Sequence, residues 1–240
     1  MRRDYFNFDG VSSLAYGVWL SGATMENRPA RDVSKHKIPG RNGTLVTDNG
    51  RWDEVEISYS CAILSDFSKE YGNLMARLSK ARGHRRLWDS LHPDHFRLGA
   101  FHMETEPNTT PYNKAGQFLL RFSCRPERFL IAGERAVRFD APGTLLNPTL
   151  FPAQPVITVT GDGPGVLSVG GRDVVFLEQS GGVVLDCESM DAFARTEGGV
   201  ESRTSWIHAP EFPVLEPGKN QISFSGGITA VEIVPRWWTL

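Results

Sequence analysis

Histidines near the middle of the chain are the first residues that could carry chemistry. His92 and His95 enclose Asp94, and His102 follows nearby, so imidazole and carboxylate groups could act as metal ligands. A structural zinc site takes four ligands, however, and the cysteines lie far away in the sequence. The group also falls on an expected turn, where polar residues are common. We therefore expect turn residues here and no metal site.

Carboxylates are the next candidates, because a pair of them can hydrolyse a glycosidic bond. Asp53, Glu54 and Glu56 lie close together, and Asp186 lies in an apolar stretch beside Cys187. Glu54 and Glu56 share the polar face of an expected strand, which favours solvent exposure. An aspartate at a sheet edge, bonded to backbone N–H groups, explains Asp186 equally well. With no G-x-S-x-G nucleophile motif either, we expect no catalytic residue and no enzymatic activity.

A glycine-rich run, residues 161–165, resembles a loop that cradles phosphate. It matches neither the dinucleotide-binding pattern nor the P-loop pattern, since no helix with the required glycines or G-K-[ST] follows. Pro164 also removes one backbone N–H that a phosphate cradle would use. We expect a hairpin loop at this position and no bound cofactor.

Five tryptophans could form a platform for a sugar ring, since aromatic faces stack on sugars. They are Trp52, Trp88, Trp206, Trp237 and Trp238. Tryptophans so scattered in sequence are more often core and interface residues. Adjacent residues of a strand point to opposite faces, so one member of the final pair is expected to be exposed. A module that binds the glycans of a host cell wall is therefore the alternative function.

Composition describes an ordinary soluble globular protein, with 40% hydrophobic and 22% charged residues. No apolar run approaches the roughly 20 residues of a membrane span, and Arg2-Arg3 precede no apolar segment, so we expect neither membrane insertion nor a secretory signal. Cys61, Cys124 and Cys187 are odd in number and far apart. We expect reduced, half-buried thiols in a protein made in the cytoplasm.

Charge divides the chain into two parts. The net charge is −2 overall, +4 over residues 1–133 and −6 over residues 134–240. This asymmetry indicates two domains with those bounds and complementary surfaces in an assembly. The positive charge of the first part is too weak and too mixed to predict a nucleic-acid site.

Local patterns predict the elements of the first part. Apolar residues alternate with polar ones from Val55 to Ile63, which predicts a half-buried strand. A helix is expected after an N-cap at Ser65-Asp66, with Gly83 ending it. The remaining expectations are an arm or twisted edge strand over residues 26–37, a turn over residues 48–50, a hairpin over residues 85–104, and a strand from Phe118 that Pro126 ends.

The second part reads as short strands separated by glycine pairs. Gly170-Gly171 suits a two-residue hairpin, and Gly226-Gly227 is expected to turn between two strands. Short strands separated by such turns are typical of an antiparallel β-sandwich or jelly roll. The segment Ile131-Ala132-Gly133 is the expected linker between the two parts.

A shaped loop, residues 38–45, stands out between the expected arm and the strand that begins at Val55. Pro39 fixes its own φ, and Gly40 and Gly43 can adopt positive φ. Asn42-Gly43 is also a strong signal for a tight hairpin turn. This loop presents Arg41, a planar cation with five donors.

Several of these stretches, in this order and spacing, resemble the distal tail proteins of long-tailed siphophages and prophages of Gram-positive bacteria. The stretches are Phe8-Asp9-Gly10-Val11-Ser12-Ser13, Tyr16-Gly17-Val18, Ile38-Pro39-Gly40-Arg41-Asn42-Gly43-Thr44, Tyr59-Ser60-Cys61, Asn147-Pro148-Thr149, Pro155-Val156-Ile157, Phe212-Pro213-Val214-Leu215-Glu216-Pro217-Gly218-Lys219-Asn220 and Val234-Pro235-Arg236-Trp237. The resemblance runs nearly end to end, although each stretch alone is weak.

The resemblance implies a mainly β fold, with a β-barrel-like ring domain containing one α-helix and a galectin-like antiparallel β-sandwich after it. It implies a structural virion protein that forms a hexameric ring at the distal end of the tail. Its partners would be the tail tube protein and the tail-tip or baseplate hub protein, with DNA only in transit through the channel. We expect Pro39, Gly40, Arg41, Asn42 and Gly43 to lie at the interface between ring subunits.

Overall fold

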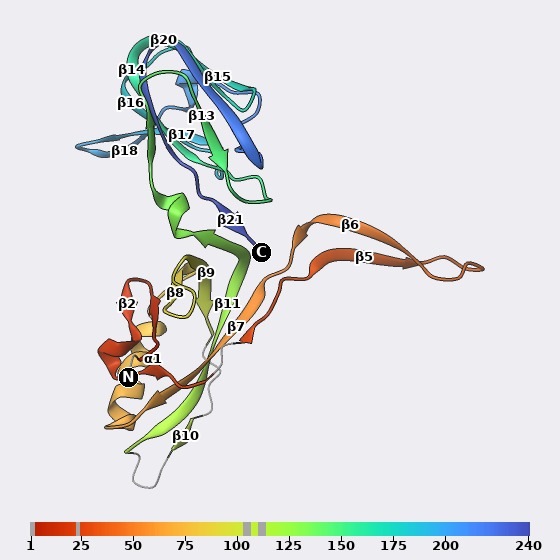
Figure 1. The fold of residues 1–240 in the computed structure, drawn as a ribbon, viewed down its shortest axis with the longest axis vertical. Helices are drawn as coiled ribbons and strands as arrows, with labels where there is room; N and C mark the ends of the chain where they lie inside the picture. The colour runs from red at the N-terminus through yellow and green to blue at the C-terminus, as the bar shows by residue number, and fades with distance from the viewer. Residues whose placement is uncertain (1–2, 23–24, 103–106, 110–113) are drawn as a thin grey trace. The chain divides into compact units, whose positions relative to one another are not determined.

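The computed structural model describes residues 3–22, 25–102, 107–109 and 114–240 (Figure 1). The chain is mainly β with antiparallel sheets, and its described residues contain one α-helix, which confirms the expected fold class. It forms two compact units, Met1–Arg128 together with Leu240, and Phe129–Thr239. The separate roles expected for residues 1–133 and 134–240 stay a prediction.

The sheet of the first unit follows the path β2-β1-β8-β9-β11-β7-β3, with β10 beside β11 and β4 beside β7. Over the described residues this sheet is open and does not close into a barrel. Its strands are β1 (Phe6–Phe8), β2 (Val11–Ser12), β3 (Trp19–Leu20), β4 (Met25–Glu26), β7 (Val55–Ile63), β8 (Arg85–Asp89), β9 (His95–Phe101), β10 (Asn108–Thr109) and β11 (Gly116–Leu130).

Strand β7 has the bounds that the alternating pattern predicts, and it pairs with β11 from Val55 opposite Cys124 to Ile63 opposite Gly116. The expectation of a half-buried strand is wrong, because Glu56 is its only exposed residue. Pairing with β11 on one edge and with β3 and β4 on the other makes β7 a central strand of the sheet.

Strand β11 corrects the expectation that Pro126 ends the strand, since it continues to Leu130. The pairing with β7 stops at Cys124, so the missing N–H of Pro126 leaves no gap in that ladder. The carbonyl of Pro126 instead accepts a hydrogen bond of 3.4 Å from Nη1 of Arg97.

The helix α1 (Phe67–Leu78) packs Phe67, Leu74 and Leu78 into the core of the first unit. It begins after Asp66, as expected, but the Asp66 side chain makes no capping hydrogen bond. The expected end at Gly83 is wrong, because the helix already ends at Leu78. Backbone bonds from Lys80 N to Arg77 O and from Ala81 N to Leu78 O tighten the chain into a turn there, before Gly83 is reached.

Aromatic side chains fill much of this core. Phe6 stacks on Tyr59 with ring centroids 5.5 Å apart, and Phe122 meets both rings edge-on at 5.9 and 6.0 Å. Phe8 lies 5.0 Å from Phe122. The rings come from β1, β7 and β11, so their contacts join strands that are distant in the sequence.

A separate two-stranded sheet forms the arm, which consists of β5 (Arg31–Lys37) and β6 (Thr44–Trp52) and extends away from the other strands of the first unit (Figure 1). The arm expected over residues 26–37 is present over residues 31–37, whereas Glu26 belongs to β4, which pairs with β7. The turn expected at residues 48–50 is wrong, because these residues lie inside β6. The register shifts there, from Arg31 opposite Trp52 to Val33 opposite Asp48, so the Gly50 φ of 77° serves a bulge.

The second unit is an antiparallel sheet system with the path β12-β20-β14-β16-β17-β18, to which β13, β15 and β19 also pair. Its strands are β12 (Val137–Phe139), β13 (Gly143–Asn147), β14 (Val156–Val169), β15 (Arg172–Phe176), β16 (Ser180–Asp186), β17 (Asp191–Thr196), β18 (Gly199–Ser202), β19 (Ile207–His208) and β20 (Gly218–Val234). The unit also contains β21 (Trp238–Thr239), which is not part of this sheet system. Short 3-10 turns are η1 (Ser13–Tyr16) in the first unit and η3 (Ile131–Glu134) and η4 (Thr204–Trp206) in the second.

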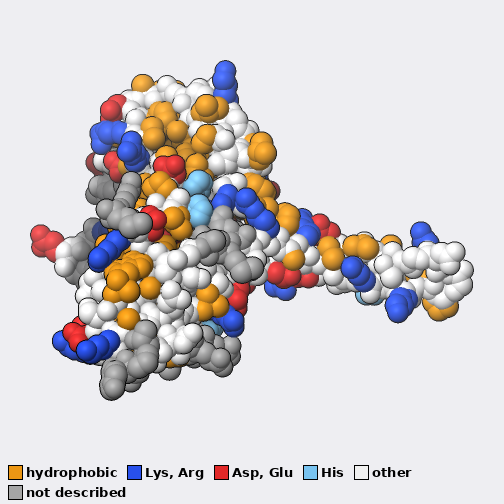
Figure 2. All heavy atoms as spheres, turned by 60° about the horizontal axis from the view of Figure 1, so that its bottom comes forward, with side chains coloured by type: hydrophobic (Ala, Val, Ile, Leu, Met, Phe, Trp, Pro, Cys, Tyr) orange, Lys and Arg blue, Asp and Glu red, His pale blue; other side chains and the backbone are white. Residues whose placement is uncertain are grey.

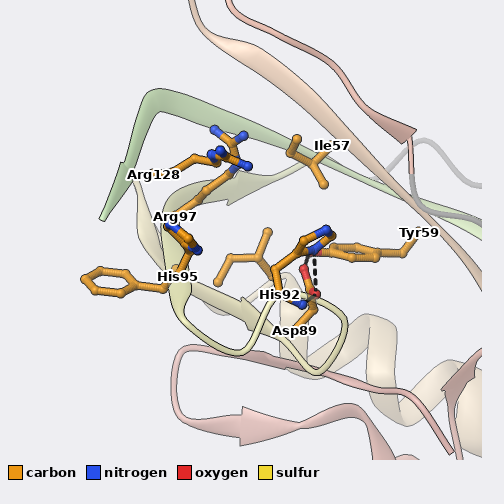
Figure 3. A pocket seen from close by; sticks show the side chains of 9 residues that line it. Ile57, Tyr59, Asp89, His92, His95, Arg97 and Arg128 are labelled. Carbon is orange, nitrogen blue, oxygen red and sulfur yellow. Dashed lines mark hydrogen bonds and ion pairs between the residues drawn. The ribbon is translucent and has the colours of Figure 1, made fainter. Parts of the chain in front are cut away.

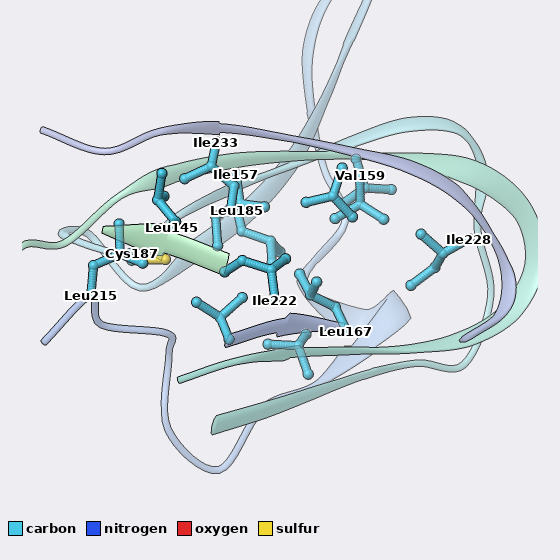
Figure 4. Close-up of a cluster of buried hydrophobic side chains, with 14 of the residues drawn as sticks. Leu145, Ile157, Val159, Leu167, Leu185, Cys187, Leu215, Ile222, Ile228 and Ile233 are labelled. Atoms are coloured by element: carbon cyan, nitrogen blue, oxygen red, sulfur yellow. The ribbon is translucent and has the colours of Figure 1, made fainter. Parts of the chain in front are cut away.

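Aliphatic side chains dominate the core of the second unit, as Figure 4 shows. Ile157 and Leu167 from β14, Leu185 from β16 and Ile222 from β20 are all essentially inaccessible to solvent. The expected linker at residues 131–133 is not a free segment, because it forms η3 and the carbonyl of Gly133 accepts a 2.9 Å hydrogen bond from Arg236 N.

Two glycine-rich segments of this unit are bulges and not turns. Residues 161–165 lie within β14, and Gly226-Gly227 lies within β20, where the register of the two paired strands shifts. A Cβ on Gly227 would lie 2.0 Å from the carbonyl oxygen of Asp162. Glycine is needed because the two backbones approach too closely for a side chain. The hairpin expected at Gly170-Gly171 is confirmed by the pairing of Val169 with Arg172.

All three cysteines are free and buried. Burial raises the pKa of Cys124 and of Cys187 to about 12, and it raises the pKa of Cys61 as well. These thiols are inert core residues at neutral pH. The described part of the chain contains no helix whose length and hydropathy would let it cross a bilayer.

Candidate functional site

The tip of the arm contains the five residues expected at an interface between subunits. Arg41 N donates a 3.2 Å hydrogen bond to Ile38 O and closes a turn, while Gly40 and Gly43 have φ angles of 77° and 84°. Every residue from position 38 to 43 is exposed. The tip is thus a defined turn that presents Arg41 to solvent, and its role at an interface stays a prediction.

Ion pairs brace the base of the arm. Asp48 accepts a 2.8 Å bond from Arg31, and Asp32 pairs with Arg51. The backbone N–H of Gly50 is the main cause that lowers the pKa of Asp48, and the hydrogen bond from Arg51 lowers the pKa of Asp32. These exposed pairs fix the geometry of the bulge more than they stabilise the fold.

The outer half of the arm is both cationic and apolar. Residues 33–47 include Lys35, Lys37 and Arg41 but no aspartate or glutamate. Leu45 and Val46 are 50% and 53% exposed. Figure 2 shows hydrophobic and basic side chains along this projection. Because β5 and β6 pair only with each other among the described residues, their outer edges also leave backbone groups available to a partner.

A pocket in the first unit is lined by His92 and His95, two of the three histidines that the sequence suggested as metal ligands, whereas His102 is not among its lining residues (Figure 3). Asp89 Oδ2 accepts a 2.7 Å bond from the Tyr59 hydroxyl, and Asp89 Oδ1 lies 3.0 Å from Nδ1 of His92. His95 also lines the pocket. Over the described residues no group of three or more His, Cys, Asp and Glu could hold a metal ion.

Tyr59 and Asp89 form a buried polar pair that the sequence patterns did not reveal. Burial, together with the negative charge of Asp89, raises the pKa of Tyr59 well above its usual range. Asp89 is 8% exposed and also accepts backbone bonds from Leu91 and His92. Tyr59 falls on the apolar side of the alternating strand pattern, so the sequence indicates that its hydroxyl needs a hydrogen-bond partner. Nothing in the sequence indicates which residue that partner is.

Glu54 and Glu56, which the sequence suggested as part of a catalytic pair, form hydrogen bonds and ion pairs within the chain. Glu54 bonds to Ser123 and lies 3.2 Å from Nε2 of His84, and Glu56 lies 3.8 Å from Arg121. Both carboxylates are exposed, as the sequence indicates.

Asp186 pairs with Arg236 at 2.8 Å and accepts a backbone bond from Glu188. Partial burial alone would raise the pKa of Asp186, but the hydrogen bonds and charge of Arg236 outweigh burial and lower it. The expected backbone partner is therefore present, and Arg236 is the partner that the sequence did not indicate.

Each of the tryptophans that the sequence suggested as a sugar platform has a partner or a buried position within the chain, and Nε1 of Trp88 donates a 3.1 Å hydrogen bond to Pro93 O. Trp52 lies under Arg31 on the arm, and Trp206 lies under Arg203 in the second unit. Trp237 is 5% exposed in the core. Trp238 stacks on Phe151 with ring centroids 4.5 Å apart.

The fold defined by these two units, with one helix and a two-stranded arm in the described part of the first, is that of phage distal tail proteins. No protein-family model and no curated protein matches the sequence. The crystal structure of SPP1 Dit (gp 19.1), described as a paradigm of the hub adsorption apparatus in phages that infect Gram-positive bacteria, is similar over 100% of both chains, with a TM-score of 0.73 and 14% identity.

Two structures of the phage P2 baseplate in its activated conformation are also similar. The one with Ca has a TM-score of 0.52 and 8% identity over 97% of both chains. The one with Sr has a TM-score of 0.51 and 9% identity over 97% of this chain and 98% of the other. The resemblance expected from the sequence is confirmed at the level of the fold.

Proposed function

We propose that this chain is a structural protein of a phage tail tip, which joins the tail tube to the tail-tip or baseplate hub. The observation that carries the proposal is the similarity to SPP1 Dit over the whole of both chains. More specifically, we propose that six copies of the chain form a ring at the distal end of a long non-contractile tail, and that DNA passes through the channel of this ring. The protein would be made in the bacterial cytoplasm and act in the virion.

The arm supports a ring because it provides a surface that another copy can cover. A subunit of a ring uses two different surfaces, head to tail. The exposed side chains of Leu45 and Val46 supply apolar area, and Arg41 supplies directed hydrogen bonds. We propose that the tip, residues 39–43, contacts a neighbouring subunit.

The test compares Arg41→Ala with Arg82→Ala, an exposed arginine of the same unit outside the arm. We expect Arg41→Ala to raise the concentration needed for ring assembly about tenfold, as loss of an interface arginine does. Both variants should keep the monomer's stability within about 0.5 kcal/mol, since both side chains are exposed.

Light scattering and negative-stain microscopy, with the hub partner present, measure the assembly. Rings in the unmodified chain and in Arg82→Ala, but fewer in Arg41→Ala, would support both the ring and the interface. Monomers alone at high concentration with the hub would contradict the ring. Equal assembly of the two variants would contradict the role of the tip.

A further inference from the structure

The geometry points to Asn42 as a self-modification site, at which the free protein converts an amide to a carboxylate by deamidation. The sequence has two Asn-Gly pairs, Asn42-Gly43 and Asn49-Gly50, and both lie on the arm. All four residues are exposed, so exposure does not distinguish the pairs. Their hydrogen bonds do.

The reaction needs a free side-chain amide and a free backbone nitrogen in the next residue. The deprotonated Gly43 nitrogen attacks Cγ of Asn42, a C–N bond forms, and the Cγ–Nδ2 bond breaks with loss of ammonia. Water then opens the five-membered succinimide ring at either carbonyl and leaves aspartate or isoaspartate. Glycine favours the attack because it has no side chain to hinder the approach.

Asn42 meets both requirements. Its side chain has no hydrogen bond within the described part of the chain, and Gly43 N donates none there. Residues 41–43 form a bend at the tip and not a paired strand. The amide carbon and the attacking nitrogen can therefore adopt the reactive geometry without the loss of a hydrogen bond.

Asn49 meets neither requirement. Its Nδ2 donates 2.8 and 3.2 Å bonds to Asp32 and Ser34, which hold the amide in place. Gly50 N, the nitrogen that would attack, donates a 2.7 Å bond to Asp48 Oδ1. Reaction here requires the loss of these bonds, each of which stabilises the unreactive geometry.

The change would alter the tip that the proposed function places at a subunit interface, and this consequence rests on that proposal. Conversion at Asn42 adds a negative charge beside Arg41, so residues 38–43 change from a net charge of +1 to zero. The isoaspartate product also lengthens the backbone within the turn. Modified subunits should therefore join rings less well, and an interface that covers the tip should protect it.

The experiment incubates the free, full-length chain at mildly alkaline pH and maps its peptides by mass spectrometry. Asn42 should convert about tenfold or more faster than Asn49, because two or more hydrogen bonds hold the second site. Conversion at equal rates, or an intact Asn42 beside a converted Asn49, would overturn the inference. Asn42→Gln serves as the control that removes the signal at the tip.

A second variant tests the cause. Asp32→Ala, Ser34→Ala and Asp48→Ala combined remove the three acceptors that hold Asn49 and Gly50. Conversion at Asn49 should rise toward the rate at Asn42, whereas an unchanged rate would show that these bonds do not protect it. Circular dichroism confirms that the variant stays folded.

Assembled tails or rings separate this inference from the proposed function. Slower conversion of Asn42 in the assembly than in the free chain supports both. Conversion at the free-chain rate would contradict the proposed interface and leave the deamidation site standing. No conversion in the free chain would contradict the site and leave the interface to the Arg41→Ala test.

Discussion

At the scale of single residues, the first unit depends on a polar pair inside an aromatic core. Tyr59 is 2% exposed and donates to Asp89, whose other oxygen accepts two backbone N–H groups. A buried carboxylate is tolerated only when donors surround it. The pair therefore ties β7 to the end of β8 with a geometry that apolar contacts alone would not specify.

Replacing Tyr59 by phenylalanine tests the pair. Tyr59→Phe should lower the free energy of unfolding by about 1–3 kcal/mol, because it keeps the ring but takes a donor from buried Asp89. The control is Tyr5→Phe, whose hydroxyl makes no hydrogen bond in the described part of the chain and should matter by less than about 0.5 kcal/mol. Urea denaturation measures both, and equal stability of the two variants would argue against the pair.

At the scale of elements, the second unit is organised by a bend that β14 and β20 share, at the bulges formed by residues 161–165 and by Gly226-Gly227. Gly161, Gly165 and Gly227 allow the two backbones to approach where the register shifts. Both long strands continue through this bend and contribute core residues on each side of it, such as Val159 and Leu167 in β14. The glycines thus let one strand pair serve two parts of the core.

A methyl group at the bend should be costly. Gly227→Ala places a Cβ 2.0 Å from Asp162 O and should destabilise the second unit by about 3 kcal/mol, as overpacking does at its upper range. Gly182→Ala is the matched control in β16, because no atom lies within 4 Å of its Cβ. Thermal unfolding measures both variants, and a harmless Gly227→Ala would show that the bend relaxes easily.

The bend also shows what local sequence can predict. The alternation from Val55 to Ile63 gives the bounds of β7 because the pattern and the strand have the same period. Gly170-Gly171 and Gly226-Gly227 look alike, yet the first is a hairpin and the second a bulge. The difference depends on the pairing of β14 with β20, which lie far apart in the sequence, and a local pattern does not contain it.

The arm likewise has one feature that local sequence predicts and another that it does not. The shaped tip at residues 39–43 follows from its proline and glycines, because these fix backbone angles locally. The bond that holds the Asn49 amide does not follow from local sequence, because its acceptor Asp32 lies on β5 and comes close to Asn49 only when β5 and β6 pair.

The arm should be the least protected strand pair of the free chain. Exposed two-stranded sheets are marginal in water, and frayed elements open with free energies near zero. Backbone amides of β6 should exchange with deuterium at least about a hundredfold faster than those of β7, which is central and buried. Equal protection in the monomer would indicate stabilisation that the arm's own contacts do not supply.

At the scale of the whole molecule, the two units differ in the titratable groups that their cores enclose. The first unit buries Cys61, Cys124 and Tyr59, whereas the second buries Cys187. Burial raises the pKa of each of the four above its value in an unfolded chain, which is near 8.5 for cysteine and near 10 for tyrosine. Each group therefore costs the folded state no stability at a pH below its unfolded pKa, where both states hold the proton. Above that pKa the unfolded chain loses the proton first, and the group destabilises the folded state.

Alkaline pH should consequently destabilise the first unit more steeply than the second. Above about pH 10 the unfolded chain releases protons that the folded chain retains, so the free energy of unfolding falls by about 1.4 kcal/mol per pH unit for each group. Three groups give the first unit a slope of about 4 kcal/mol per pH unit, and one gives the second about 1.4. Urea unfolding from about pH 8 to 11, followed by limited proteolysis and mass spectrometry, assigns each transition to a unit. Tyr59→Phe should flatten the slope of the first unit by about a third, and parallel slopes in the two units would mean that these buried groups do not control alkaline stability.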